Sequence, residues 1–400
     1  MSRSKIVVGL EIGTTKTCMV VGEIRPDCSA VIIGGAEVAS AGISGGEIRD
    51  MSMARQTVFD VWQKTQEATD VEIFQVLISV TGDHIQGESN VGSLRLPDNE
   101  NVVDHHHMNE VVAKAKQIEI TSDRDILHQE VGNFNVDGRQ SILYATGISA
   151  RTLDIKCFTI HGIATRILNS SMCARQIPLN VTHAVFAGLA SAQAVLTKQQ
   201  KEAGALLIDI GGGSADYICY EDIDIVACGS IPKGGAQINQ DIVDKSGQRH
   251  MSLKAAEHFK CKEGNAFGEV KDTTLARYVT DTGTEYVIER GRLNEIIRDR
   301  LASILLQIKD KIPASVWNRS GMTVYLSGGT SLMRGLDNLA QFIFKVPVKQ
   351  PLPPGAGEEY SYLSDPRYCT AIGLIRHAQR IEESKPGWFR RIINYLFGNN

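Results

Sequence analysis

The chain has 400 residues, of which 42% are hydrophobic and 22% are charged, and its formal net charge is −4. This length favours two or more domains with cores of their own, and the slightly acidic balance argues against a nucleic-acid-binding protein. The eight cysteines form no Cys-x-x-Cys pair, which indicates reduced, buried thiols in a cytosolic protein. No apolar run approaches the roughly 18 residues of a membrane span, so we expect any membrane contact to be peripheral.

The first 80 residues alternate apolar runs with turns and predict strands over 6–10, 18–23 and 30–38, a helix over 52–68 and a strand over 74–80. The first two strands enclose a turn rich in glycine and hydroxyl groups, which a carboxylate precedes. Its residues are Glu11, Gly13, Thr14, Thr15 and Lys16. Glycine turns are common in hairpins, so this one gains significance only if a second turn of the same kind faces it across a polyphosphate.

Residues 83–163 predict a small α/β subdomain inserted into the chain. Short β patterns over 87–96, 142–148 and 155–160 alternate with one helix, over about 108–116.

Three consecutive histidines, 105–107, follow Asp104 just before that helix. They could bind a metal, but consecutive imidazoles do not easily converge on one ion. We therefore favour a solvated loop with a helix N-cap.

The most informative stretch follows predicted elements over 162–172 (helix), 175–178 (strand) and 182–196 (a helix rich in alanine and glycine). An apolar run enters over 206–208, a carboxylate and a glycine turn follow, and a second apolar run leaves over 217–220. The turn residues are Asp209, Gly211, Gly212, Gly213 and Ser214. We interpret this stretch as a β-hairpin whose bare backbone can crowd its amide groups around phosphate oxygens. Asp209 could hold a hydrated Mg²⁺ against those phosphates.

Two further glycine pairs support a phosphate-binding function. One follows a predicted strand over 223–230 and opens a helix over 236–245, and the other lies between a strand and a helix at 324–332. These residues are Gly234, Gly235, Gly328, Gly329 and Leu332.

A predicted helix over 252–260 carries Glu257 and Lys260 three residues apart on one face. From the pattern alone, a surface ion pair is the simpler interpretation. The alternative is a pair of side chains that flank a sugar or a base.

A long amphipathic helix, or a pair of helices, is predicted over 286–311, followed by an irregular proline-rich segment over 347–366 and a helix over 370–381. The long helix carries several arginines. They form either a solvated basic face or a docking site for an acidic peptide.

The segment 388–400 follows a short linker over 382–387 and predicts an amphipathic helix. Aromatic and aliphatic side chains form one face, and arginines lie beside it, which suits a helix in a membrane interface. The residues of this predicted anchor are Trp388, Phe389, Arg390, Arg391, Ile392, Ile393, Leu396 and Phe397. The alternative is a helix packed on its own core or in a partner's groove.

In their order along the chain, these motifs resemble the actin/Hsp70 nucleotide-binding superfamily, and in detail the FtsA family of bacterial division proteins. The segments that carry the likeness are 9–14, 186–191, 194–197, 256–260, 326–329 and 368–374. The resemblance implies an α/β, actin-like fold of two lobes, which are duplicated ribonuclease-H-like domains. It adds the inserted α/β subdomain and a C-terminal amphipathic helix.

The resemblance also implies domain boundaries. The expected parts are the lobe 1 core (1–82 and 164–181), the inserted subdomain (83–163), the lobe 2 core (182–230 and 320–381), the upper part of lobe 2 (231–319), the linker (382–387) and the membrane helix (388–400).

The resemblance further implies ATP and Mg²⁺ in the cleft between the lobes, with Asp209 and Glu11 reaching the metal through water and Glu257 and Lys260 at the adenosine. It implies filaments on the cytoplasmic face of the bacterial inner membrane at the division site. The implied partners are other copies of the chain, membrane lipid, further division proteins and the C-terminal peptide of FtsZ. Candidates for binding that peptide are Arg290, Arg298 and Arg300.

One position departs from the superfamily pattern. A Glu or Gln commonly orients the attacking water in the helix before the second phosphate hairpin, whereas this chain has Ala187 and no carboxylate over 182–196. We therefore expect tight ATP binding with slow or absent hydrolysis. Two other functions remain open at this point: a sugar or acetate kinase of the same superfamily, and an actin-like protein of pilus assembly.

Overall fold

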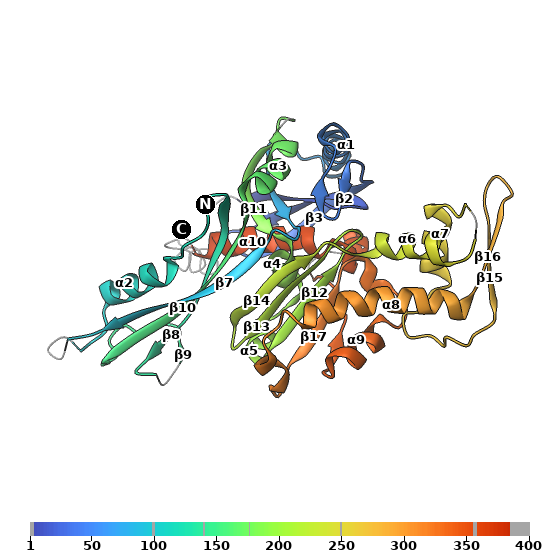
Figure 1. The fold of residues 1–400 in the computed structure, drawn as a ribbon. Coiled ribbons are helices and arrows are strands. Elements are labelled where there is room, and N and C mark those ends of the chain that lie inside the picture. Colours follow the sequence, from blue (N-terminus) through green and yellow to red (C-terminus); the bar gives the residue numbers. More distant parts are fainter. Residues whose placement is uncertain are drawn as a thin grey trace.

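The computed structural model describes residues 4–97, 101–138, 141–175, 177–248, 250–354 and 358–384. Two five-stranded sheets form the centre of the molecule, and the inserted subdomain extends from them to one side (Figure 1). None of the described helices is long and apolar enough to cross a membrane.

The lobe 1 sheet has the strand order β11-β6-β1-β2-β3. Its strands are β1 (Lys5–Ile12), β2 (Lys16–Ile24), β3 (Ala30–Ala39), β6 (Gln75–Val80) and β11 (Asn180–Phe186). The first three form an antiparallel meander, and β6 and β11 extend it as parallel strands. The hairpin that we predicted around Gly13 is therefore confirmed, with Glu11 paired to Cys18 in the register.

The lobe 2 sheet repeats this arrangement with the order β14-β13-β12-β17-β18. Its strands are β12 (Ala205–Ile210), β13 (Ala215–Glu221), β14 (Asp224–Ile231), β17 (Thr323–Ser327) and β18 (Val348–Lys349). Again three antiparallel strands come first and two parallel strands follow. Because both sheets place their first hairpin at the same position, the duplication brings two similar turns to face each other.

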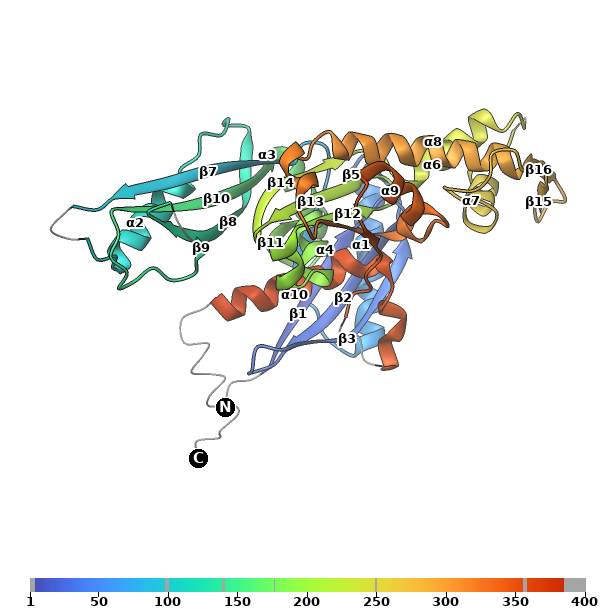
Figure 2. The ribbon, with the colours of Figure 1, turned by 90° about the horizontal axis from the view of Figure 1, so that it is seen from below.

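Two helices, α4 (Ala187–Val195) and α10 (Cys369–Ser384), pack against each other between the sheets (Figures 1 and 2). A side chain at Gly373 would collide with the backbone of Ala190, so the small residues of this segment allow close helix packing. Both helices belong largely to the hydrophobic core of lobe 1.

The prediction of a helix over 182–196 was wrong for the first part of this segment. Asn180–Phe186 is strand β11, which pairs with β6. Where a strand was expected over 175–178, the described residues end a helix at Arg175 and form a turn at 177–178. The expected domain boundary at 182 therefore falls inside a strand of lobe 1, and α10, which we had placed in lobe 2, packs mainly on lobe 1. The sequence pattern failed here because pairing with a buried neighbour overrides a weak helical periodicity.

The remaining helices cover the outer faces of the two lobes. They are α1 (Met51–Thr69), α3 (Ala164–Arg175), α5 (Lys198–Ala203), α6 (Gly235–Lys245), α7 (Leu253–Lys262), α8 (Arg290–Lys309) and α9 (Leu336–Phe344). The long helix begins later than predicted, at Arg290, because Glu285–Glu289 forms strand β16, which pairs with β15 (Leu275–Val279). The short strands β4 (Ile43–Ser44) and β5 (Glu47–Ile48) form a small hairpin.

The inserted subdomain has its own hydrophobic core under a sheet with the order β7-β10-β8-β9. Its elements are β7 (Gln86–Arg95), α2 (His105–Lys116), β8 (Arg124–Val136), β9 (Ser141–Ile142) and β10 (Thr152–Ile163). The strand β8 was missed, and the strand predicted over 142–148 shrinks to its first residue. The histidines begin α2, and Asp104 caps it by accepting from the amide of His107 at 2.8 Å.

Candidate functional site

A cleft of about 830 Å³ lies between the two lobes, and both glycine hairpins line it. Of the residues predicted to bind the nucleotide, all but Gly234 line this cleft. They are Glu11, Gly13, Thr14, Thr15, Lys16, Asp209, Gly211, Gly212, Gly213, Ser214, Gly235, Glu257, Lys260, Gly328, Gly329 and Leu332. Positions more than 300 residues apart in the sequence thus meet at one site.

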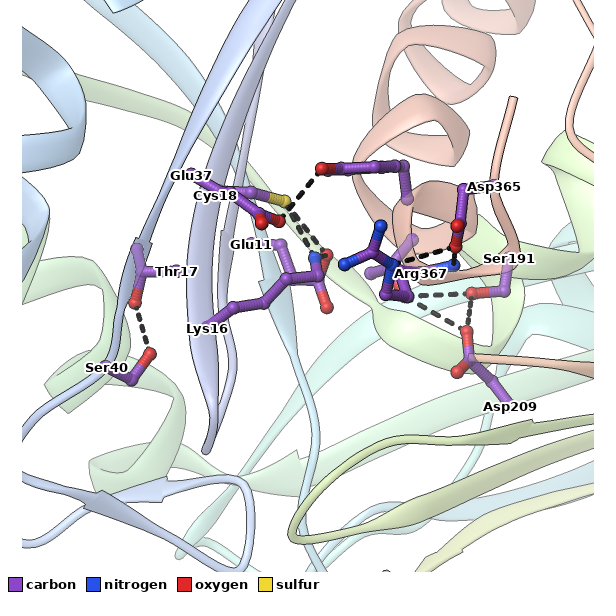
Figure 3. Close-up of polar contacts among 12 residues, drawn as sticks. Glu11, Lys16, Thr17, Cys18, Glu37, Ser40, Ser191, Asp209, Asp365 and Arg367 are labelled. Carbon is purple, nitrogen blue, oxygen red and sulfur yellow. Dashed lines mark hydrogen bonds and ion pairs between the residues drawn. The ribbon is translucent and has the colours of Figure 1, made fainter. Parts of the chain in front are cut away.

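The first hairpin contributes charged side chains to the cleft. Lys16 Nζ lies 3.0 Å from Glu11 Oε2, and the Cys18 thiol lies 3.1 Å from Lys16 Nζ and 3.2 Å from Glu11 Oε2 (Figure 3). Burial raises the pKa of the Cys18 thiol, which therefore stays protonated. Burial alone would lower the pKa of Lys16, but the charge of Glu11 and the hydrogen bonds to Glu11 and Cys18 outweigh it and raise that pKa. Lys16 remains a cation beside Glu11.

The second hairpin contributes bare backbone. An added Cβ at Gly212 would collide with the side chain of Thr15, and one at Gly213 would collide with Thr14. Glycine is thus needed at both positions for the turns of the two lobes to approach each other. Their amide groups remain close to any anion that enters between them.

Gly234 and Gly235 hold the second hairpin in place. The amide of Gly235 donates to Gly211 O at 3.0 Å, and Thr330 Oγ1 donates to the same oxygen at 2.9 Å. Gly234 packs so tightly that a Cβ would collide with the carbonyl oxygens of this turn. The glycine pair that opens α6 therefore positions the β12–β13 hairpin, a role that the sequence did not indicate.

Asp209 is buried at the floor of the cleft. Its Oδ2 accepts hydrogen bonds from Ser191 on α4 and from Thr370 on α10, the latter at 3.1 Å (Figure 3). Burial raises the pKa of Asp209 to about 6, against these hydrogen bonds, and the nearby Glu11 raises it further. Across the hairpin, Asp216 pairs in register with Asp209.

Asp216 accepts a hydrogen bond from Thr81 at 2.5 Å, and burial raises its pKa to about 7. The charges of Asp209 and Glu11 also contribute to that rise. A divalent cation would relieve this repulsion, and carboxylate oxygens are ligands that Mg²⁺ prefers. No three acidic, histidine or cysteine side chains among the described residues lie close enough to hold a metal directly. Glu11, Asp209 and Asp216 thus offer oxygen donors of the type that a hydrated Mg²⁺ prefers.

The cleft is also lined by an ion pair on α7, whose Lys260 Nζ donates to Gly235 O at 3.2 Å. Lys260 Nζ lies 2.6 Å from Glu257 Oε2, which also accepts from Asn239 at 2.5 Å. Burial opposes ionisation of Glu257, but Lys260 outweighs it and lowers the pKa of that carboxyl. Leu332 is 53% exposed beside this pair and offers an apolar surface. Both interpretations of Glu257 and Lys260 are thus compatible with the structure, since they form an ion pair that also lines the cleft.

Sequence reasoning missed four polar residues at the cleft floor: Thr81, Ser191, Asp216 and Thr370. The hairpin register gave a usable signal for Asp216, because a four-residue turn places it opposite Asp209. The other three come from distant elements, so only the fold brings them to the site.

The three arginines proposed for peptide binding lie on α8 and do not line this cleft. Arg290 pairs with Glu263 at 2.6 Å, and Arg298 donates to the backbone oxygen of Ala266 at 3.4 Å. Arg300 makes a two-point ion pair with Asp241, at 2.5 and 2.8 Å. Each is engaged within the chain.

The predicted membrane anchor, 388–400, lies outside the described residues.

Comparison with known proteins identifies the family. Residues 206–373 match the family model "Cell division protein FtsA", and residues 82–161 match the SHS2 domain inserted in FtsA. The FtsA of Neisseria meningitidis serogroup B is 30% identical over 94% of this chain and 91% of its own length. The FtsA of Escherichia coli K12 is 27% identical over 98% of this chain and 97% of its own.

Two solved structures share the fold at low sequence identity. One is a PilM-PilN type IV pilus biogenesis complex, with a TM-score of 0.62 and 14% identity over 93% of this chain and 98% of the other. The second is MreB 5 of Spiroplasma citri bound to AMPPNP, with a TM-score of 0.55 and 15% identity over 96% and 98% of the two chains. Together, the full-length relatives, the inserted subdomain and the actin-like architecture show that this chain belongs to the FtsA family of cell division proteins.

Proposed function

We propose that the cleft binds ATP with Mg²⁺ and that the ATP-bound chain is an adapter of the division machinery. In this role it polymerises and ties FtsZ filaments to the cytoplasmic face of the inner membrane. The observation that carries the proposal is the meeting of glycine turns from both lobes above a buried carboxylate. An actin-like neighbour holds a triphosphate analogue, which supports a nucleotide as the ligand.

Each part of the cleft has a task in this proposal. The backbone of Gly211, Gly212 and Gly213 surrounds phosphate oxygens, and Lys16 supplies a positive charge from the opposite lobe. Asp209, with Glu11, orients a hydrated Mg²⁺, which would neutralise charge on the phosphates. Glu257 and Lys260 contact the adenosine. Because the ligand touches both lobes, it stabilises their closed arrangement by linkage.

We further propose that hydrolysis is slow. Ala187 lies at the start of α4 and lines the cleft, where a Glu or Gln would be needed to orient water. ATP then acts as a conformational ligand that favours assembly. Rapid release of phosphate by the purified chain would contradict this part of the proposal.

Membrane and partner binding complete the proposal. The segment 388–400 would lie in the membrane interface, and many copies on one filament would bind together more tightly than one. The face of α8 that carries Arg290, Arg298 and Arg300 would receive the acidic C-terminal peptide of FtsZ. Since Arg290 already pairs with Glu263 and Arg300 with Asp241, and Arg298 donates to the backbone, the peptide would have to share or displace existing contacts.

A reconstitution experiment tests this function. The full chain, vesicles and FtsZ are mixed with ATP and Mg²⁺, and sedimentation and electron microscopy follow the recruitment of FtsZ to lipid. We expect recruitment with ATP and its loss when Ile393→Glu places a charge on the apolar face of the tail. Recruitment that is indifferent to both changes would contradict the proposal.

The kinase alternative predicts phosphate transfer to a small acceptor, which the same protein can be assayed for. The pilus-type alternative rests on fold similarity alone, and the division proteins match nearly the whole chain. Neither alternative is favoured by a feature of the cleft.

A further inference from the structure

A second cleft, of about 450 Å³, lies between the inserted subdomain and lobe 2, and the end of α10 forms part of its wall. We call it the tail-root cleft, because α10 ends at Ser384 and Glu383 lines the cleft. It is separate from the interlobe site, with which it shares no lining residue.

Cations outnumber carboxylates in the tail-root cleft, although the whole chain is acidic. Its cations are Lys156, Lys198, Lys201, Arg376 and Arg380, and its carboxylates are Glu130, Asp224 and Glu383. Arg380 pairs with Glu130 at 2.5 Å. Arg376 donates to the carbonyl oxygens of Ala30 and Pro354, both at 3.1 Å, and so keeps its charge without a carboxylate at ion-pair distance among the described residues.

Lys201 is the most informative of these cations. Its Nζ lies 4.8 Å from the centre of the Tyr220 ring, and no described carboxylate lies within ion-pair distance of it. Burial, together with the charge of Arg380, lowers the pKa of Lys201 to about 8, although the charge of Glu130 opposes this shift. A partly buried cation without a carboxylate at ion-pair distance would be stabilised by an anion that entered the cleft.

The position of this cleft restricts what can reach it. Only three residues separate Ser384, the last described residue of α10, from Trp388, the first large apolar residue of the proposed anchor, so the two are four positions apart. A fully extended chain of that length spans about 14 Å. If the anchor lies in the membrane interface, the end of α10 lies within that distance of it. The headgroup layer on each side of the hydrocarbon core is itself several ångströms thick.

We propose that the tail-root cleft receives the phosphate headgroup of an anionic lipid, as a second membrane contact beside the anchor. This inference rests on the proposed membrane function and adds a lipid preference to it. Lys156, Lys198 and Lys201 supply charge at the mouth and wall, and the apolar side chains of Val131 and Leu143, which are 37% and 62% exposed, lie at the same opening.

Two other occupants fit less well. The anchor segment itself carries Arg390 and Arg391, so the net positive charge of the cleft would repel it. An acidic peptide would match the charge, but the short link to the proposed anchor keeps the end of α10, and with it Glu383 in the wall of the cleft, close to the lipid surface.

The test uses the full chain and sedimentation with vesicles of phosphatidylcholine, alone or with about 30% phosphatidylglycerol. A triple variant, Lys156→Gln with Lys198→Gln and Lys201→Gln, removes three charges from the cleft. A matched control, Lys64→Gln with Lys271→Gln and Lys349→Gln, removes three charges from exposed positions that do not line it. Each lysine close to an anionic surface strengthens binding severalfold.

We expect the cleft variant to bind anionic vesicles about tenfold more weakly than the wild type, and the control variant to bind within twofold of it. Neither should change binding to pure phosphatidylcholine. Equal binding by the two variants would overturn the inference. So would a loss confined to the binding of a labelled hexaglutamate peptide, which would identify a peptide site. Absence of all vesicle binding by the wild type would instead refute the membrane function on which the inference rests.

Discussion

The two hairpins that meet in the interlobe cleft hold the same place in two sheets of the same strand order, yet they offer different chemistry. The β1–β2 turn presents side chains, with Lys16 held at 3.0 Å from Glu11. The β12–β13 turn presents backbone, with three glycines after a buried Asp209. The duplication thus fixes where the two turns lie, while the sequence of each turn decides whether it offers side chains or backbone amides to the cleft.

The largest effect is expected from a substitution that adds a side chain to the β12–β13 turn and so removes the difference between the two hairpins. In Gly213→Val the new side chain would collide with Thr14 of the opposite turn and hold the lobes apart. We expect ATP affinity to fall by about a hundredfold or more, because closely placed amides act only in a narrow geometry. Titration with a fluorescent ATP analogue measures the effect.

Gly211→Ala is the matched control for that variant. Its added Cβ would meet only Ser214 O, at 3.4 Å, which is an ordinary contact. We expect a loss of less than about threefold in affinity, since no backbone has to move. An equal loss in both variants would show that the turn is merely sensitive to any substitution.

The two carboxylates provide the next test, with a smaller expected effect. Asp209→Asn should weaken Mg²⁺-dependent ATP binding by about 10- to 100-fold, as losses around a metal site usually do. Glu11→Gln should cost less than about tenfold, because Lys16 already neutralises Glu11. Titrations of each variant with ATP, with and without Mg²⁺, separate the effect on metal binding from the effect on nucleotide binding. If Glu11→Gln proved the more damaging variant, the assignment of roles to the two hairpins would be reversed.

Much of this site could be predicted from the sequence, because its signals are local. Gly13 and Gly211 each follow an apolar strand and a carboxylate, and such hairpins need no distant partner to be recognised. The expectation that both turns line one cleft rested on the family resemblance. The structure explains why they meet there, because the two sheets repeat the same strand order.

The sequence-based predictions failed where tertiary contacts determine the secondary structure or bring distant residues together. Asn180–Phe186 is a strand because β6 lies beside it, and β8 pairs with β10 although its own pattern is weakly alternating. Ser191 and Thr370 reach Asp209 from α4 and α10, which meet only in the packed protein. No local pattern carries that information.

Asp216 is a further difference between the two hairpins. It lies opposite Asp209 in the β12–β13 hairpin, whereas Cys18 lies opposite Glu11 in the β1–β2 hairpin. Burial is the main cause that raises the folded pKa of Asp216 to about 7, far above the ordinary value of 3.8 for an aspartate. The folded state therefore holds the proton more tightly than the unfolded state, so stability falls as pH rises from about 4 to about 7. Above pH 7 the full cost of the buried charge is present.

Asp216→Asn should remove this dependence while Asn Oδ1 still accepts from Thr81. We expect the variant to gain roughly 2 kcal/mol relative to the wild type between pH 5 and pH 8 in the absence of nucleotide, allowing for partial relaxation around the charge. Thermal midpoints at the two pH values measure the gain. A constant difference between the two proteins across this range would contradict the buried charge as its cause.

The smallest expected effect concerns Cys18, which lies beside the Lys16–Glu11 pair but is a weak hydrogen-bond donor. Cys18→Ala should leave ATP affinity within about twofold, because the ion pair persists without the thiol. It should lower stability by about 1 kcal/mol, since the sulfur fills a fully buried position. Thermal denaturation and nucleotide titration measure the two quantities. A tenfold loss of affinity with unchanged stability would mean that the thiol helps to orient Lys16, so that the first hairpin would depend on three side chains and not on two.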